Sequence, residues 1–162
     1  MKKILLVIVT VLFVFSMAYS GDFTYIGSKK CKMCHKGEKK GMVYEKWEKG
    51  PHAKAFETLK KEGGETKAEC IVCHTTGYDK GGYKMGDANA ANFAHVGCES
   101  CHGPGSAYKK MSIMKDKAKA IENGLIIPSE KVCIKCHNEK SKDFKGFNYD
   151  EYVKKIDHTY EK

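Results

Sequence analysis

The chain joins a strongly apolar start to a long polar remainder. A largely apolar run, Ile4 to Phe15, follows the basic residues Lys2 and Lys3, and Ala18-Tyr19-Ser20 supplies small residues before Gly21. This order of basic, apolar and small residues is typical of a secretory signal peptide, and the run is too short to span a bilayer. We therefore predict a signal peptide at residues 1–20 and export to the periplasm or another exported location. An uncleaved membrane anchor is the alternative.

The polar remainder carries helical periodicity in several places. Apolar residues recur at helical spacing over Lys39–Lys49, and a second helix is expected over Pro51–Lys60, where proline suits the first turn and Gly63-Gly64 ends the pattern. A third stripe predicts a helix over Ser106–Glu122. The last helix is expected to start at Asn148, which suits an N-cap. These patterns predict a mainly helical chain.

The segment between His74 and Cys98 has a different pattern. Its glycines at positions 77, 81, 82 and 86 favour turns. Asp79-Lys80-Gly81-Gly82 suggests a short hairpin within this segment. We expect an irregular loop here.

Every cysteine of the chain lies in a repeated pentapeptide, Cys-x-x-Cys-His. The copies are Cys31-Lys32-Met33-Cys34-His35, Cys70-Ile71-Val72-Cys73-His74, Cys98-Glu99-Ser100-Cys101-His102 and Cys133-Ile134-Lys135-Cys136-His137. The pentapeptide is the attachment signature of haem c: both thiols form thioether bonds to the porphyrin, and the histidine is the proximal iron ligand. We therefore predict four covalently attached haem c groups.

Two other uses of eight cysteines are possible. Structural zinc sites can be built from Cys-x-x-Cys pairs, and a secreted chain can pair its cysteines in disulfides. Neither use requires a histidine directly after the second cysteine of each pair. The repetition of that histidine favours haem.

The high content of charged residues limits the size of the apolar core. With 30% charged residues, the chain has little apolar material for a core, so the haems are expected to supply much of the interior. We predict one tetrahaem cytochrome c domain at residues 21–162. Its fold class is mainly α with extensive loops, a small multihaem cytochrome c fold organised around four covalent haems.

The polypeptide has a formal net charge of +9. Haem propionates would reduce that charge, and the lysines are scattered without an aromatic-interleaved basic patch. We therefore expect no nucleic-acid partner. The lysines suit a docking surface for an acidic redox protein.

The number of histidines limits how many haem irons can have two histidine ligands. Of seven histidines, four follow the motif cysteines, which leaves His52, His95 and His158 as candidate distal iron ligands. Three histidines cannot cap four irons. At least one haem is therefore capped by another group, for which Met111 and Met114 are candidates, or stays open. His158 faces away from the apolar stripe of the last helix unless that helix ends before it.

The sequence resembles the tetrahaem cytochrome c-554 family, an electron carrier associated with hydroxylamine oxidoreductase, and the wider cytochrome c-552/4 domain. The resemblance covers most of the mature chain. It rests on Gly27 to His35, Trp47 with Pro51 to Ala55, Cys70 to His74 with Gly77-Tyr78 and Gly81 to Tyr83, Val96 to Gly105, and Tyr149 to Ile156.

This resemblance implies ligand roles. His52 would cap the third haem and His158 the first, and the second haem, on His74, would be five-coordinate. The family's distal ligand for the fourth haem lies in the helix after the third motif, where this chain has methionines and no histidine. His95 is an extra histidine that could take that role.

The leading functional hypothesis is an exported carrier that passes single electrons between redox proteins, and not an enzyme. An octahaem oxidoreductase or a membrane quinone-linked cytochrome would be a suitable partner, and no transmembrane segment remains after signal cleavage. The alternatives are binding or reduction of a small nitrogen oxide at an open haem, and a protomer of an extracellular haem filament. The oligomeric state stays open.

Overall fold

The computed structural model describes residues 23–159, so the predicted signal peptide lies outside the described residues. This part of the chain consists of short helices and long loops. The helices are α2 (Ser28–His35), η1 (Glu38–Lys40), α3 (Val43–Lys49), η2 (His52–Lys54), α4 (Ala55–Lys61), α5 (Ala68–His74), η3 (Ala90–Asn92), α6 (Cys98–His102), α7 (Met111–Met114), α8 (Lys117–Glu122), α9 (Glu130–Cys133) and α10 (Tyr149–Ile156). No strand occurs between residues 23 and 159.

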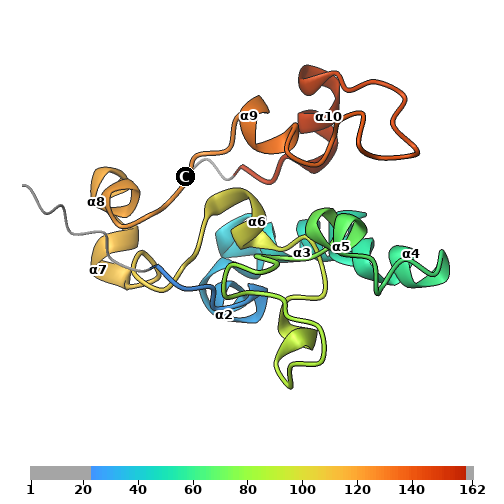
Figure 1. The fold of residues 1–162 in the computed structure, drawn as a ribbon. Helices are drawn as coiled ribbons and strands as arrows, with labels where there is room; N and C mark the ends of the chain where they lie inside the picture. The colour runs from blue at the N-terminus through green and yellow to red at the C-terminus, as the bar shows by residue number, and fades with distance from the viewer. Residues whose placement is uncertain (1–22, 160–162) are drawn as a thin grey trace, which may run out of the picture.

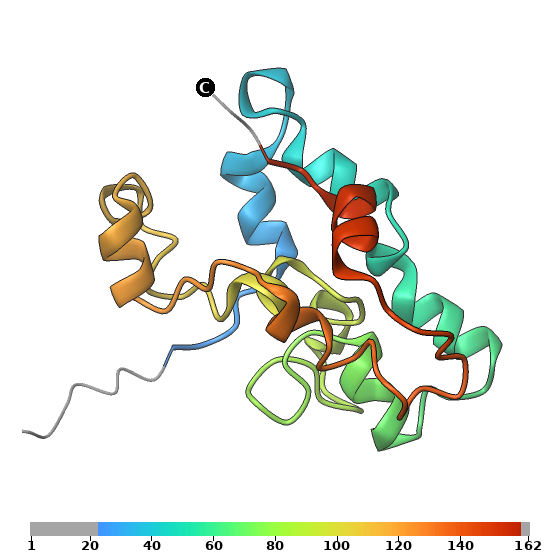
Figure 2. The ribbon, with the colours of Figure 1, turned by 90° about the horizontal axis from the view of Figure 1, so that it is seen from above.

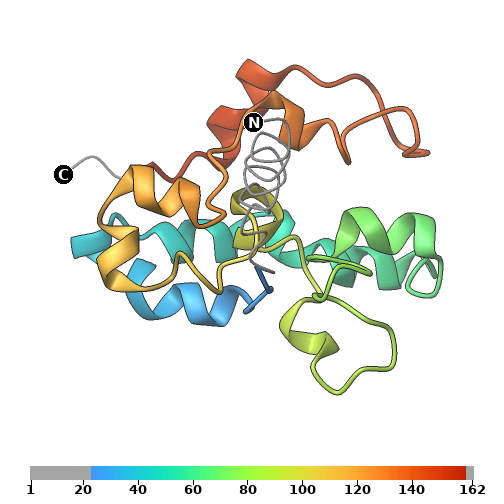
Figure 3. The same ribbon diagram turned by 60° about the vertical axis from the view of Figure 1, so that its left-hand side comes forward.

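The helices form two levels (Figure 1). Helices α2 to α6 make up the lower level, and the C-terminal segment from α9 to α10 lies above it. Seen from above, α10 lies over the stretch of chain from α3 to η2 (Figure 2). Helices α7 and α8 stand to one side, away from α4 and α5 (Figure 3). Within residues 23–159, no helix has the length and apolarity that crossing a membrane requires.

The two helices predicted before residue 62 are present with shorter bounds. Met42, which has a left-handed backbone, separates η1 from α3 within the range expected to be one helix. Pro51 precedes η2 and α4, and Gly63, with φ of 67°, follows the end of α4. Proline and glycine therefore act here as expected.

The helix predicted over Ser106–Glu122 is broken, so that prediction is wrong in its extent. Residues 106–110 form turns, and α7 and α8 are separate short helices. The Asp116 carboxylate accepts a hydrogen bond from the Lys119 backbone N–H at 3.1 Å and thus caps a new helix start. An N-cap has non-helical backbone angles, so it interrupts the continuous helix that the apolar stripe suggested.

The hairpin expected around residues 79–82 is also absent. The Tyr83 N–H donates to the Thr76 carbonyl at 2.8 Å, and the Gly82 N–H donates to the Gly77 carbonyl at 3.0 Å. These bonds close a tight turn, and no paired strands extend from it. The rest of the segment is loop, as predicted, apart from the short helix η3.

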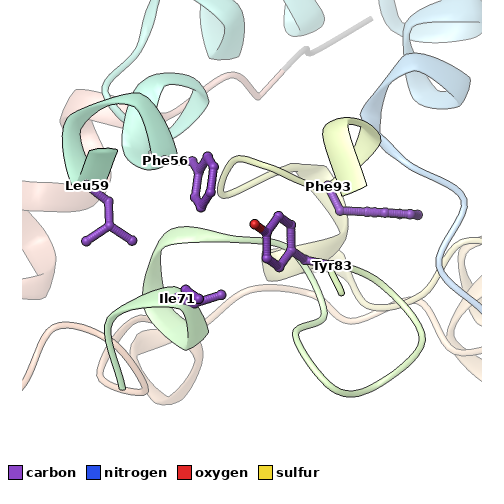
Figure 4. Packing of buried hydrophobic residues seen from close by; sticks show 5 residues of the cluster. All are labelled: Phe56, Leu59, Ile71, Tyr83 and Phe93. Atoms are coloured by element: carbon purple, nitrogen blue, oxygen red, sulfur yellow. The ribbon is translucent and has the colours of Figure 1, made fainter. Parts of the chain in front are cut away.

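The side-chain core is small. It comprises Phe56 and Leu59 of α4, Ile71 of α5, and Tyr83 and Phe93 of the following loop (Figure 4). Phe56 and Tyr83 pack with ring centroids 5.2 Å apart. This cluster fixes α4 against α5, and so positions the second cysteine motif.

The final helix follows the sequence pattern closely. The Asn148 side chain accepts a hydrogen bond from the Glu151 N–H at 3.3 Å, so it caps α10 as expected. The helix ends at Ile156. His158 therefore lies beyond the helix, and its direction is not set by the helical stripe.

Candidate haem sites

Each Cys-x-x-Cys-His motif is associated with a short helix. The first three motifs lie on α2, α5 and α6, and α9 ends at Cys133, the first residue of the fourth. Two residues three positions apart share one face of a helix, so α2, α5 and α6 each present both thiols of their motif on one side. None of the eight cysteines forms a disulfide, which leaves all the thiols available for thioether bonds.

The first and third motifs lie side by side. Helices α2 and α6 are in contact, and the Cys31 thiol donates a hydrogen bond to the Cys98 sulfur, which raises the pKa of Cys31. The Cys98 backbone N–H also donates to the Ser28 hydroxyl, at 3.3 Å. The haem attachment points of these two motifs are therefore adjacent.

The second and fourth motifs also meet. A hydrogen bond from the Cys136 thiol lowers the pKa of Cys73 to about 6. Burial raises the pKa of Cys101 to about 11, and the nearby Cys133 adds to that rise, so the third motif adjoins the fourth. The attachment points thus form a continuous series in the order first, third, fourth, second motif.

Two proximal histidines are oriented by backbone carbonyls. The His74 Nδ1–H donates to the Ala55 carbonyl at 2.8 Å, and the His102 Nδ1–H donates to the Ile126 carbonyl at 3.2 Å. Such bonds fix the tautomer and leave Nε2 as the ligating nitrogen. His137 is oriented differently, by stacking on Phe147 at 4.8 Å between ring centroids.

Two spare histidines each face a proximal histidine. The ring centroids of His52 and His137 are 6.1 Å apart, and those of His158 and His102 are also 6.1 Å apart. An imidazole nitrogen binds a metal ion at about 2 Å, so rings on opposite sides of one iron have centroids roughly 6 Å apart. Both pairs therefore fit the two axial positions of one haem iron.

These partners differ from those that the family resemblance implied. His52 lies beside the proximal histidine of the fourth motif, not the third, and His158 lies beside that of the third motif, not the first. The resemblance matches positions along the chain. Tertiary packing decides which motif a given loop reaches, and the sequence pattern does not contain that information.

His95 lies in a different setting. Its Nε2 is 3.1 Å from the Ser28 hydroxyl, and its ring packs edge-on against Trp47 with centroids 5.2 Å apart. The Trp47 indole N–H in turn donates to the Val96 carbonyl at 3.0 Å. The contacts of His95 thus join the start of α2, helix α3 and the loop before α6.

Burial favours the neutral form of four candidate iron ligands. It is the largest cause of a lowered pKa for His35, His52, His102 and His137. His158 contributes a smaller lowering for both His35 and His102, so it lies near both residues. Only neutral imidazole binds a metal, so these surroundings favour ligation.

The methionine candidates lie on α7. Met111 is 58% exposed and Met114 is partly buried. Neither contributes to the buried core cluster.

A functional feature that sequence reasoning missed is Glu99, inside the third motif. This carboxylate is 2% exposed, and it accepts hydrogen bonds from the backbone N–H groups of Ile26, Gly27 and Gly105 at 2.7–3.1 Å. It ties the segment before α2 to α6 and to the loop that follows. The x positions of the motif carry no signal that would distinguish such a residue.

Comparison with known proteins places this geometry in context. Residues 30–103 match the family model described as cytochrome c554 and c-prime. Cytochrome c-554 of Nitrosomonas europaea is 29% identical over an alignment of 171 positions, which covers 87% of this chain and 70% of that protein. The solved structure of reduced cytochrome c554 from the same organism has a TM-score of 0.65 at 28% identity and covers 84% of both chains.

These likenesses confirm three predictions. The suspected family is the one that the comparisons find, and the fold class is that of a small helical multihaem cytochrome. The cofactor prediction of four covalently attached haem c groups is also confirmed. The motif cysteines and the paired histidines described above are the residues in this chain that suit such groups.

Proposed function

We propose that this relative of cytochrome c554, a c-type cytochrome that carries electrons, is exported to the periplasm and passes single electrons between redox partner proteins. The series of adjacent attachment points is the observation that carries the proposal. When bound, haem c supplies a redox-active iron at each point. The chain supplies the order in which electrons move between them.

The polypeptide's part is to hold the haems close together and partly away from water. Cys31 beside Cys98, and Cys73 beside Cys136, give two pairs of neighbouring haems. The proximity of Cys101 and Cys133 joins the two pairs. We therefore propose that an electron entering at either end crosses the protein through all four haems.

We propose that the histidines set the coordination of these haems. His35, His74, His102 and His137 would hold the irons as proximal ligands, and His52 and His158 would be the distal ligands of the haems on His137 and His102. Bis-histidine coordination keeps the iron low-spin and excludes other ligands. Such haems are suited to electron transfer and not to substrate chemistry.

The proposed partners are acidic redox proteins. The formal charge of +9, spread over many lysines, favours complementary docking. An octahaem oxidoreductase as electron donor and a membrane quinone-linked cytochrome as acceptor fit this role.

Binding of a small nitrogen oxide is the second candidate function. The structure brings His52 and His158 to other motifs, and His74 itself is fixed by Ala55. We propose that the iron on His74 keeps a free axial position, in agreement with the family resemblance.

Rapid-mixing kinetics with a purified redox partner test the carrier role. Reduced protein should lose all four electrons to an oxidised partner in a reaction whose rate depends on partner concentration. A small uncharged oxidant serves as the control for general haem reactivity. Turnover of a nitrogen oxide without any protein partner would instead favour the second candidate. Large assemblies in sedimentation experiments would favour a filament.

A further inference from the structure

The three spare histidines have distinct surroundings, and these surroundings limit how many irons they can cap. His52 pairs with His137, and His158 pairs with His102. The third spare histidine, His95, is the one that could still cap the haem on His35 or the haem on His74.

His95 is held away from that role by contacts on several sides. Its Nε2 bonds to Ser28, whose side chain is 2% exposed, and Trp47 covers an edge of its ring. Its backbone carbonyl accepts a hydrogen bond from the Thr76 hydroxyl at 2.7 Å. Thr76 is 1% exposed, and its hydroxyl also accepts a hydrogen bond from the Gly97 N–H at 2.9 Å. His95 is therefore held both through its backbone carbonyl and through its ring.

The position of His158 does not change the number of capped irons. His158 lies near both His35 and His102, and its ring pairs with that of His102 at the spacing of two axial ligands. One imidazole nitrogen binds one iron. If His158 turned to His35, the haem on His102 would lose its distal histidine instead.

We infer that the haem on His35 has no histidine on its distal side, so that this chain holds a second site, besides the one on His74, where a small diatomic ligand binds ferrous iron. This second site departs from the single five-coordinate haem that the family resemblance implied. The inference rests on the proposed function in requiring four attached haems and an open iron on His74. It holds whether or not the protein exchanges electrons with a partner.

Carbon monoxide titration of the fully reduced holoprotein tests the inference without a variant. The haem content is first measured by pyridine haemochrome absorbance, which separates loss of haem from loss of ligand binding. We expect two equivalents of carbon monoxide for four haems. A single equivalent would overturn the inference, including the case in which Met111 or Met114 caps the iron on His35.

Variants locate the site. Replacing both Cys31 and Cys34 with alanine should remove one haem and one equivalent of carbon monoxide binding. Replacing both Cys133 and Cys136 should remove one haem and leave two equivalents bound. Loss of a carbon monoxide equivalent only in the second variant would contradict the assignment.

The His95→Gln variant tests the remaining assumption. Glutamine retains a side-chain amide that can bond to Ser28, and so it preserves the packing contact without supplying an imidazole. The variant should bind two equivalents of carbon monoxide, as the unchanged protein does. Three equivalents would show that His95 caps an iron and would overturn the inference.

Discussion

His52 and His137 face each other with their ring centroids 6.1 Å apart and their planes at 65°. His52 begins η2, whereas His137 follows α9 in the upper level of the molecule. The pair therefore links the two levels of the fold through what we propose to be one iron. Removal of either ring should affect both coordination and stability.

Replacing His52 with alanine should convert the haem on His137 from low-spin to high-spin. The reason is that no other imidazole lies opposite His137 in the described part of the chain. Electron spin resonance of the ferric protein should show one additional high-spin haem, and carbon monoxide binding should rise by one equivalent. An unchanged spectrum would refute the proposed pairing of His52 with His137.

Replacing Glu99 with alanine should destabilise the protein strongly. Its buried carboxylate satisfies three backbone N–H groups, and each hydrogen bond to a charged group contributes about 1.5–3 kcal/mol. We expect a loss of about 3 kcal/mol or more in the free energy of unfolding, measured by chemical denaturation of the holoprotein. Glu57→Ala, at an exposed position of α4, is the matched control and should have little effect. Equal effects of the two changes would show that the Glu99 contacts contribute no net stability.

Acid should destabilise the protein partly through His95. Burial, and then the charge of Lys29, lower the pKa of His95 below its ordinary value of 6.5. The unfolded chain therefore binds the proton more tightly, so the contribution of neutral His95 is complete above pH 6.5 and is lost as the pH falls through the lower folded-state pKa. His95→Gln should show a smaller loss of thermal stability across this range than the unchanged protein. Parallel stability curves would argue against a buried, neutral His95.

Electron exchange with an acidic partner should slow as salt is added. Lysine-rich docking depends on long-range attraction, which is screened over about 8 Å at physiological ionic strength. Stopped-flow rates should fall severalfold between low and high salt, whereas reduction by an uncharged small molecule should change little. A partner reaction that is insensitive to salt would contradict charge-steered docking.

The chemistry of the sites could be predicted from the sequence because it is local. Two cysteines and a histidine within five residues define a haem attachment point wherever they occur, and the fold need not be known. The cap at Asn148 and the glycine stop after α4 are local in the same sense.

The relations between the sites could not be predicted, because they depend on tertiary packing. Nothing in the sequence around His158 shows that its ring lies opposite His102. Similarly, Glu99 occupies a variable position of its motif, and its role depends on the approach of Ile26 and Gly27 from the start of the chain. The broken helix before Gly124 shows the same limit, since an apolar stripe does not reveal the cap at Asp116.

The haem content of the purified, exported protein tests the central claim most directly. Pyridine haemochrome absorbance, compared with the protein concentration and with the intact mass under denaturing conditions, gives the number of covalently bound haems. We predict four haems for each chain, one at each Cys-x-x-Cys-His motif. A mass equal to that of the bare polypeptide, or to that of the polypeptide with bound zinc, would contradict it.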